Sequence, residues 1–527
     1  MSSGALDVAA RLRAIDALGS GELDLLVVGG GITGAGAALD AATRGLRVGL
    51  VEARDFAAGT SSASSKVIHG GLRYLEMGDF GLVREALRER ELLLTRTAPQ
   101  LVSPLPFLWP LRRRFERAYL GAGLLLYDRL GGARSLPRHR HLGRRAALEI
   151  APALRPDALV GGVQFHDAME DDARMVAVVA RTAAAHGAQI ATRVRVTGFR
   201  APGELAAVDE ETREPLLLRA RHVAAAAGAW TDRLRELAGG RSSLRIVPSK
   251  GVHIWVPGER IEMDTGLLAR TEKSVLFVVP FLGGWLIGDT DTPWPGGPDE
   301  VVASGADVDY LLAKVGALVS APLTRDDVHG TTAGLRPLVA DAARRDTTRI
   351  SRKHVVESPA PGLTTIAGGK YTTYRVMAAD LVDAACRELV AAAPSVTRDV
   401  PLIATREAEL RALIERRPAL REPLEGGGGH RAAEVVHACT HEGALRLEDL
   451  LERRTRLALT APDRGLAAAA PAAALMAGPL GWSPDRVRRE VESWRARVAA
   501  QRAAEAEPTD ERALAAYRAE LAERVTV

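Results

Sequence analysis

The hydrophobic and polar positions near the start of the chain predict a β-α-β unit over residues 23–52. Residues 23–28 (LDLLVV) form an apolar run with a β-branched end, which is typical of a buried strand. After GGGITG, residues 35–45 (AGAALDAATRG) place small and apolar residues at helical spacing and close on Gly45. Residues 46–52 (LRVGLVE) form a second apolar run that ends in an acid, so we expect a second buried strand here.

Two later apolar runs that break at glycine predict further strands of the same sheet. The first is VAAAAGAW at 223–230, and the second is GLTTIAGG at 362–369. A helix is expected from about residue 372 to residue 391. The two glycine breaks would return their strands to the crevice formed by the first unit.

The remaining segments differ in pattern. Residues 79–98 are helical in period, residues 244–290 read as strands separated by turns, and the chain beyond residue 400 is helical and rich in Ala, Arg and Glu. Residues 109–145 look irregular and basic, with ten arginines against two acids. Arginines interleaved with Trp109, Tyr119, Tyr127 and several leucines suit an anionic membrane surface, although most such charge runs are only solvated faces.

Composition narrows the class of protein. At 527 residues the chain is too long for one core, so two or three domains are expected. A net charge of +4 is small for this length, and we expect no nucleic-acid partner. Cys386 and Cys439 have no disulfide-scaffold or metal-ligand spacing, which predicts a reducing compartment and no metal. No signal peptide or membrane span is evident, so a cytoplasmic location is expected.

The glycines between the first strand and its helix fit a dinucleotide-binding fingerprint, Gly29-x-Gly31-x-x-Gly34. Glycine permits the tight turn and the close approach of pyrophosphate, while the helix N-terminus presents unpaired N–H groups to the phosphates. Glu52 ends the second strand and is placed to accept hydrogen bonds from an adenosine ribose.

The sequence after Glu52 favours FAD over a nicotinamide cofactor. Further β-α repeats are missing here, and the chain enters GTSSASS (59–65), whose hydroxyl groups would line an isoalloxazine ring or ribityl chain. The residues expected at the cofactor are Gly29, Gly31, Ile32, Thr33, Gly34, Glu52, Thr60, Ser61, Ser62, Lys66, His69, Gly70, Gly71, Val194, Ala227, Gly228, Trp230, Gly369 and Lys370.

The loop at 61–79 (SSASSKVIHGGLRYLEMGD) is dense in side chains that carry chemistry. It follows the second strand and should emerge at the carboxyl edge of the sheet, where ligands bind in such folds. His69 has a suitable intrinsic pKa for a general base, and Arg73 offers the fork geometry that suits phosphate or carboxylate. The alternative is a solvated polar loop in which His69 only bonds a backbone carbonyl.

Three distant motifs offer partners for this loop. SKGVHIW holds Lys250 and His253, TTAGLRPL holds Arg336, and GGKYTTYR holds Lys370 at the start of a helix. If Arg73, Arg336 and Lys370 converge, the site would be strongly cationic. It would then suit a small dianion such as a phosphate ester better than an amino acid, which also carries a cation.

Several of these motifs resemble one family. VVGGGITGAGAALDAATRG, GTSSASSKVIHGGLRYL, SKGVHI, GLRPL, SRKHVV and AGGKYTTYR are similar to the FAD-dependent, respiratory (NAD-independent) glycerol-3-phosphate dehydrogenases. The resemblance runs from about residue 20 to beyond residue 455, where LLERRTRLAL is similar to the family's C-terminal helical region. It implies oxidation of sn-glycerol 3-phosphate to dihydroxyacetone phosphate by hydride transfer from C2 to flavin N5, with electrons passed to a quinone at the membrane.

The resemblance also implies roles for individual residues. Those expected to be catalytic are His69, His253, Lys370 and Arg336, and those expected to bind substrate are Arg73, Tyr74, Arg336, Lys370 and Thr372. The base that takes the C2 hydroxyl proton stays open between the two histidines and the lysine. GDTDT at 288–292 departs from the family, which is expected to have threonine at Asp289. An added acid beside a dianion is unfavourable, so we expect Asp289 to point away from the site.

The fold expected from pattern and resemblance is α/β, α+β overall. It combines a Rossmann-like FAD-binding domain (20–98, 155–240 and 330–392), an antiparallel-sheet substrate domain (99–154 and 241–329) and a C-terminal helical domain (393–527). A homodimer on the cytoplasmic face of the membrane, in peripheral contact with it, is expected. Two alternatives remain: a related FAD oxidoreductase for an amino or hydroxy acid, and an FAD-binding protein with an RNA- or membrane-interaction role.

Overall fold

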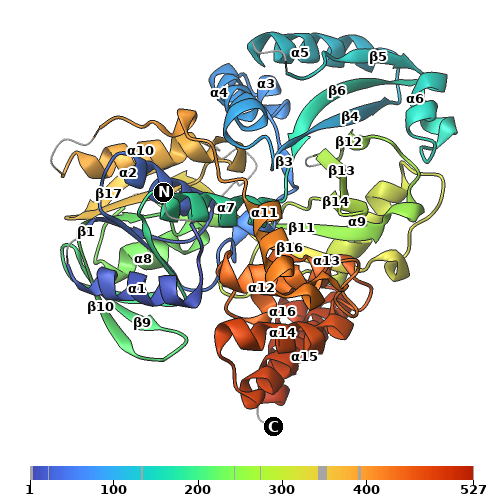
Figure 1. Cartoon of the computed structure of the whole chain (residues 1–527). Coiled ribbons are helices and arrows are strands. Elements are labelled where there is room, and N and C mark those ends of the chain that lie inside the picture. The colour runs from blue at the N-terminus through green and yellow to red at the C-terminus, as the bar shows by residue number, and fades with distance from the viewer. Residues whose placement is uncertain are drawn as a thin grey trace.

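The computed structural model describes residues 4–21, 23–131, 135–242, 244–272, 275–341, 353–389 and 393–525. Figure 1 shows two sheets, each with its own helices, and a group of helices formed by the last part of the chain. Residues 351 and 352 of the SRKHVV motif lie outside the described part.

The first sheet has a parallel centre. Its strands run in the order β17 (Val355–Ala360), β18 (Leu363–Ala367), β10 (Pro215–Ala225), β1 (Leu23–Val28), β2 (Val48–Glu52) and β7 (Gln189–Thr192). Only the β17–β18 pair in this row is antiparallel, and β8 (Val194–Ala201) and β9 (Glu204–Asp209) extend it as an antiparallel ribbon beyond β10. The predicted β-α-β unit is confirmed, since β1 and β2 pair in parallel around α2 (Ile32–Thr43).

Both faces of this sheet are covered by helices, which explains why its central strands are mostly apolar. Leu25 and Val27 of β1 pack with α2, α7 (Asp172–Ala185) and α10 (Tyr374–Cys386) on one face. Leu26 and Val28 pack on the other face with α1 (Val8–Gly19) and α8 (Thr231–Leu237). The carboxyl edge between these layers is left for a ligand.

The second sheet is largely antiparallel. Its order is β15 (Thr292–Pro293), β11 (Leu244–Pro257), β14 (Gly284–Gly288), β13 (Val275–Phe281), β12 (Gly266–Arg270), β4 (Ser103–Leu111), β6 (Gly161–Met169) and β3 (Val67–Ile68). In addition β16 (Gly330–Asp341) pairs with β11 from Leu244↔Asp341 to Trp255↔Gly330, and β5 (Arg140–Gly143) pairs with β6. Helices around this sheet are α3 (Arg73–Glu76), α4 (Phe80–Leu92), α5 (Glu116–Gly131), α6 (Arg144–Ile150) and α9 (Gly305–Gly316).

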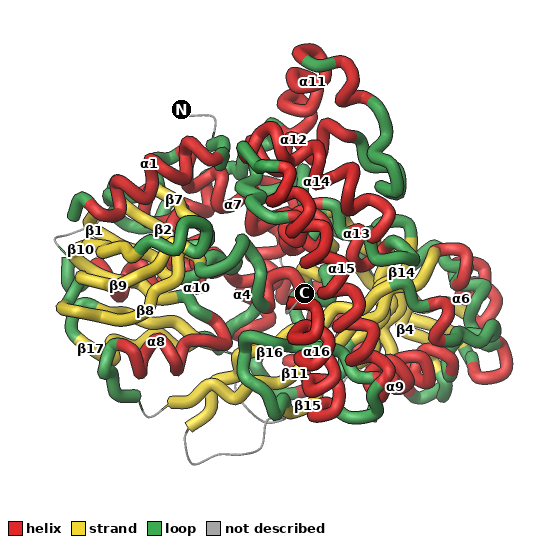
Figure 2. The backbone as a smooth tube through the Cα atoms, turned by 90° about the horizontal axis from the view of Figure 1, so that it is seen from below, coloured by secondary structure: helices red, strands yellow, loops and turns green. Residues whose placement is uncertain are grey.

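The C-terminal region is helical, as expected. It contains α11 (Arg406–Arg416), α12 (Ala432–Thr440), α13 (Leu457–Thr460), α14 (Leu466–Leu480), α15 (Pro484–Ala506) and α16 (Asp510–Val525). Figure 2 shows α15 and α16 against the β11–β16 part of the second sheet. The buried ammonium of Lys250 on β11 pairs there with Asp307 of α9 and Asp510 of α16, so one side chain ties three regions together.

The predicted fold class is confirmed by this arrangement, and one local expectation is corrected. Residues 109–145 are not irregular, because they hold the end of β4, helix α5, strand β5 and the start of α6. Sheet membership crosses the expected domain limits, which stay a prediction. Strands β6 and β16, assigned from sequence to the first layer, pair in the second sheet, and β3 does the same. These pairings join distant segments, which a local pattern does not report.

Candidate active site

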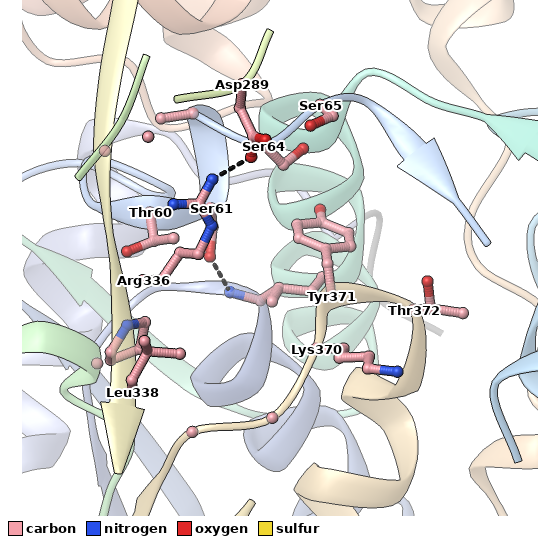
Figure 3. Close-up of a pocket in the computed structure, with 18 of the residues that line it drawn as sticks. Thr60, Ser61, Ser64, Ser65, Asp289, Arg336, Leu338, Lys370, Tyr371 and Thr372 are labelled. Atoms are coloured by element: carbon pink, nitrogen blue, oxygen red, sulfur yellow. Dashed lines mark hydrogen bonds and ion pairs between the residues drawn. The ribbon is translucent and has the colours of Figure 1, made fainter. Parts of the chain in front are cut away.

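A large cavity of about 1110 Å³ opens where the two sheets meet. Its lining comes from the carboxyl ends of β1, β2, β10 and β18, the loop at 58–65, and strands β11 and β16. Figure 3 shows part of this lining, with Thr60 and Ser61 on the loop, Arg336 on β16 and Lys370 just before α10. The cavity is therefore lined both by the ends of the parallel strands of the first sheet and by antiparallel strands of the second sheet.

The nucleotide end of the cavity is built by the glycine fingerprint. Gly29 has a φ of +116°, and a Cβ there would lie 2.5 Å from the carbonyl oxygen of Ala226. At Gly34 a Cβ would lie 1.8 Å from the Gly29 carbonyl oxygen, so only glycine allows α2 to start so close to β1. The first helical turn lacks a cap from its own N-cap residue, and Ser61 Oγ accepts from Ile32 N at 3.0 Å instead.

Glu52, the last residue of β2, completes the nucleotide part of the cavity. Glu52 Oε2 accepts from Gly30 N at 2.6 Å and Oε1 accepts from Arg54 N at 2.7 Å, which holds the carboxylate at the cavity wall. The guanidinium of Arg54 lies 4.7 Å from the ring centroid of Trp230, which also lines the cavity. A helix N-terminus for pyrophosphate and a carboxylate for ribose hydroxyls fit the adenosine half of FAD.

Most residues expected at the cofactor line the cavity, and four do not. Those that line it are Gly29, Gly31, Ile32, Thr33, Glu52, Thr60, Ser61, His69, Gly71, Val194, Ala227, Gly228, Trp230, Gly369 and Lys370. Those absent from the lining are Gly34, Ser62, Lys66 and Gly70. Each of the four lies in a segment that borders the cavity, with Gly34 in the packed turn described above.

Lys66 corrects the expectation of direct cofactor contact. Its side chain is fully buried, and its ammonium donates to Asp172 Oδ2 at 2.7 Å and to the Ser62 carbonyl at 2.8 Å. Burial lowers the pKa of Lys66, against the opposing field of the Asp172 carboxylate. The same Asp172 oxygen accepts from Ser64 Oγ at 2.7 Å. Lys66 therefore fixes the serine-rich loop from behind.

The His69 loop is fixed by two contacts from other elements. His69 N–H donates to the buried Thr372 Oγ1 at 3.2 Å, and Gly70 N–H donates to the Tyr127 hydroxyl at 2.7 Å. Tyr127 in turn donates to Asp167 Oδ1 at 2.7 Å. This is a correction for Tyr127, since the sequence placed it on an interfacial surface and the structure places it in the core.

His253 faces the same cavity from β11. Its side chain is buried, and Nε2 shares a hydrogen bond of 2.9 Å with Ser65 Oγ. Burial lowers the pKa of His253 to about 4, and the Asp289 carboxylate acts in the opposite direction. The imidazole is therefore neutral at physiological pH and is able to accept a proton.

Arg336 enters the cavity from β16, opposite β11. A Cβ at Gly251 would lie 2.6 Å from its Nη2, so the glycine makes room for the guanidinium. Asp289 corrects the expectation that it points away, because its Oδ2 accepts directly from Arg336 Nη2. Burial alone would lower the pKa of Arg336, but the carboxylates of Asp289 and Asp291 outweigh it and raise that pKa.

The other cations of the expected substrate site are only partly described. Lys370 Nζ lies 3.3 Å from the ring centroid of Tyr74, a cation–π contact that Gly71 permits because it has no side chain. Arg336, Lys370, Tyr74 and Thr372 thus line one cavity, as expected. The side chain of Arg73 lies outside the described part.

Sequence reasoning missed two polar residues of this end. Ser65, which bonds His253, stood in the serine run but carried no signal of its own. Asp291 lies 3.7 Å from Arg336 Nη1 and accepts from Ser249 Oγ, a pairing made across β11 that the local sequence does not report. Both residues line the cavity.

Part of the cavity lining is exposed and apolar. Phe80 of α4 and Tyr119, Ala122 and Leu126 of α5 belong to it, and Phe80, Tyr119 and Leu126 are among the large exposed hydrophobic side chains of the protein. Phe115, at 67% exposure, precedes α5 in the same helical period. Exposed apolar groups gathered beside a cavity are typical of a contact surface.

Comparison with known proteins agrees with this site. The family model of the FAD dependent oxidoreductases matches residues 24–375, and the C-terminal domain of alpha-glycerophosphate oxidase matches residues 405–487. Fold and cavity together define an FAD-dependent oxidoreductase.

Individual relatives narrow the family. Glycerol-3-phosphate dehydrogenase 2 of Mycobacterium tuberculosis is 45% identical over 545 residues, covering 96% of this chain and 93% of that protein. The FAD-complexed glycerol-3-phosphate dehydrogenase of Bacillus halodurans superposes with a TM-score of 0.74 at 26% identity, over 94% of this chain and 98% of that one. The glycine oxidase of Geobacillus kaustophilus superposes with a TM-score of 0.53 at 25% identity, over 69% of this chain and 95% of that one. The chain belongs to the glycerol-3-phosphate dehydrogenase family.

Proposed function

We propose that this protein oxidises sn-glycerol 3-phosphate to dihydroxyacetone phosphate with bound FAD. The observation that carries the proposal is one cavity that joins a nucleotide-binding edge to a pocket with Arg336, Lys370 and neutral His253. The identity to glycerol-3-phosphate dehydrogenases supports the same substrate.

The residues of the pocket divide the chemistry among them. Arg336 and Lys370 bind and orient the phosphate, and His253 is the group we assign to take the C2 hydroxyl proton, because its unprotonated imidazole lines the same cavity. His69, which also lines the cavity, is the second candidate for this proton. Bound FAD would accept the hydride from C2 at N5, so the cofactor supplies the redox step.

An anaerobic bleaching screen tests the proposal. The FAD-loaded protein should lose its oxidised flavin band with glycerol 3-phosphate and keep it with glycerol, since glycerol lacks the anionic group. Bleaching by amino acids or 2-hydroxy acids, with none by glycerol 3-phosphate, would assign the chain to the alternative substrate class.

We further propose a quinone as the electron acceptor and peripheral contact with the cytoplasmic face of the membrane. No helix in the described part of the chain combines the length and hydropathy needed to cross a bilayer. The support is the exposed apolar lining on α4 and α5, with exposed Arg112, Arg113 and Arg114 just before α5. Exposed aromatic and aliphatic groups beside arginines suit an anionic lipid surface, and a quinone from that surface would enter the cavity beside them.

Liposome sedimentation tests the membrane contact. Replacing Arg112, Arg113 and Arg114 with glutamine should lower the fraction bound to anionic vesicles, by about 1 kcal/mol of binding free energy per lost charge. A matched control replaces three exposed arginines of α15, namely Arg488, Arg489 and Arg495. Equal sedimentation of wild type and the first variant would refute the contact.

We also propose the predicted homodimer. The predicted domain limits likewise stay a proposal. Sedimentation equilibrium of the FAD-loaded protein would measure the mass of the assembly. A monomer at all concentrations would refute the dimer.

A further inference from the structure

The substrate end of the cavity holds a carboxylate against the arginine that we assign to the substrate phosphate. Asp289 Oδ2 accepts from Arg336 Nη2, and Figure 3 shows the two side chains directed at each other. The side chains of Arg336 and Asp289 are only 19% and 18% exposed. Solvent screens such a pair far less than a surface pair.

The contacts of the Arg336 guanidinium show which of its N–H groups the Asp289 carboxylate occupies. Nη2 donates both to Asp289 and to the Thr290 carbonyl oxygen, the latter at 3.0 Å, so both of its N–H groups are used. A guanidinium binds an oxyanion in bidentate fashion through Nη1 with Nη2, or through Nε with Nη2. Both forks include Nη2, and neither is available while Asp289 stays in place.

The remaining side of the guanidinium is also near an acid. Nη1 lies 3.7 Å from Asp291 Oδ1 and 3.5 Å from Ser249 Oγ. The single positive charge of Arg336 therefore lies between two carboxylates, and a small anion gains little from it without displacing one of them.

We propose that Asp289 is a specificity-determining residue that competes with the anionic group of the substrate for Arg336. An anion without other contacts, such as inorganic phosphate, cannot displace the carboxylate efficiently. A phosphate ester with a hydroxyl beside His253 gains further contacts and does displace it. This inference rests on the proposed function, because it assigns Arg336 to the substrate phosphate.

The test compares Asp289→Asn with wild type in the FAD-loaded protein. The amide keeps the shape of the side chain and removes its charge. Titration with inorganic phosphate, followed by the flavin absorbance, should give a Kd at least about tenfold lower in the variant. The KM for glycerol 3-phosphate should fall as well. If Asp289 only held Arg336 in position, Asp289→Asn would instead weaken the binding of phosphate and of glycerol 3-phosphate.

Asp309→Asn is the matched control. Asp309 lies on α9 and also forms an ion pair with an arginine, Arg325, but this pair is exposed. Its phosphate Kd should equal that of wild type. Asp289→Thr is the second variant if the amide lowers FAD content. An unchanged or higher phosphate Kd in both Asp289 variants, or loss of FAD from both, overturns the inference. Failure of glycerol 3-phosphate to bleach wild type is a separate result, and it refutes the proposed function.

Discussion

Removing one buried oxygen, with Tyr127→Phe, should loosen the His69 loop. The Tyr127 hydroxyl accepts from Gly70 N–H and donates to Asp167, both at 2.7 Å, and the side chain is only 2% exposed. Phenylalanine keeps the ring in its cluster with Leu82, Val83 and Leu87. The perturbation is therefore confined to two hydrogen bonds.

The expected cost follows from what each partner retains. Asp167 keeps its ion pair with Arg90, so its share of the loss is small. The Gly70 N–H loses its partner in a buried place, which costs about 1–3 kcal/mol. A middle value of about 2 kcal/mol corresponds to roughly thirty-fold faster amide exchange of the segment that contains Gly70.

Hydrogen exchange of the FAD-loaded protein, read by mass spectrometry on peptides across residues 66–75, measures this opening. Tyr119→Phe is the control on the same helix. The Tyr119 hydroxyl donates to Glu76, but Tyr119 is 56% exposed, so water can replace the lost hydrogen bond. Its effect on exchange should stay below about threefold. Equal exchange in wild type and Tyr127→Phe would refute the claim that Tyr127 holds the loop.

Two further predictions concern the substrate end. Arg336→Ala should raise KM and lower kcat/KM by about 2–4 kcal/mol of transition-state stabilisation, since it removes a charge-assisted contact and leaves Asp289 without its cation. Steady-state kinetics measures this, and a change under about tenfold removes Arg336 from the site. His253 has a folded pKa of about 4 against 6.5 unfolded, so the unfolded chain binds more protons between these values and stability falls as pH drops through them. His253→Gln should remove about 2 kcal/mol of the stability difference between pH 7 and pH 5 in denaturant unfolding, and an unaltered difference contradicts the buried neutral histidine.

Local patterns predicted the nucleotide end well. The fingerprint glycines, the strand before them and Glu52 lie within one β-α-β unit, so their geometry follows from neighbours in sequence. Arg336 and Lys370 were also found, since each stands beside residues that restrict the backbone. Both line one cavity, and the convergence of Arg73, Arg336 and Lys370 stays a prediction.

The errors concern contacts that only the folded chain makes. Lys66 was expected at the cofactor, but its partner Asp172 lies 106 residues away and draws it into the core. The direction of Asp289 depends on a turn between β14 and β15, and a repulsion argument from sequence left out the arginine facing it. Helix α5 was missed because it carries apolar residues on both sides. Leu120, Leu124 and Tyr127 are buried, whereas Tyr119, Leu125 and Leu126 are exposed, and this mixture blurs the usual amphipathic pattern.

The long antiparallel pair of β11 and β16 sets a rule for insertions and deletions. Odd-numbered Gly251 and His253 of β11 and even-numbered Gly334 and Arg336 of β16 line the cavity, with Gly251 opposite Gly334. Because successive side chains alternate between faces, one residue inserted into β16 before Arg336 would turn the arginine to the opposite face. Two inserted residues would preserve the face and shift the position by one repeat. Length variation among relatives should therefore concentrate in the turns that connect these strands, and change inside them should come in pairs.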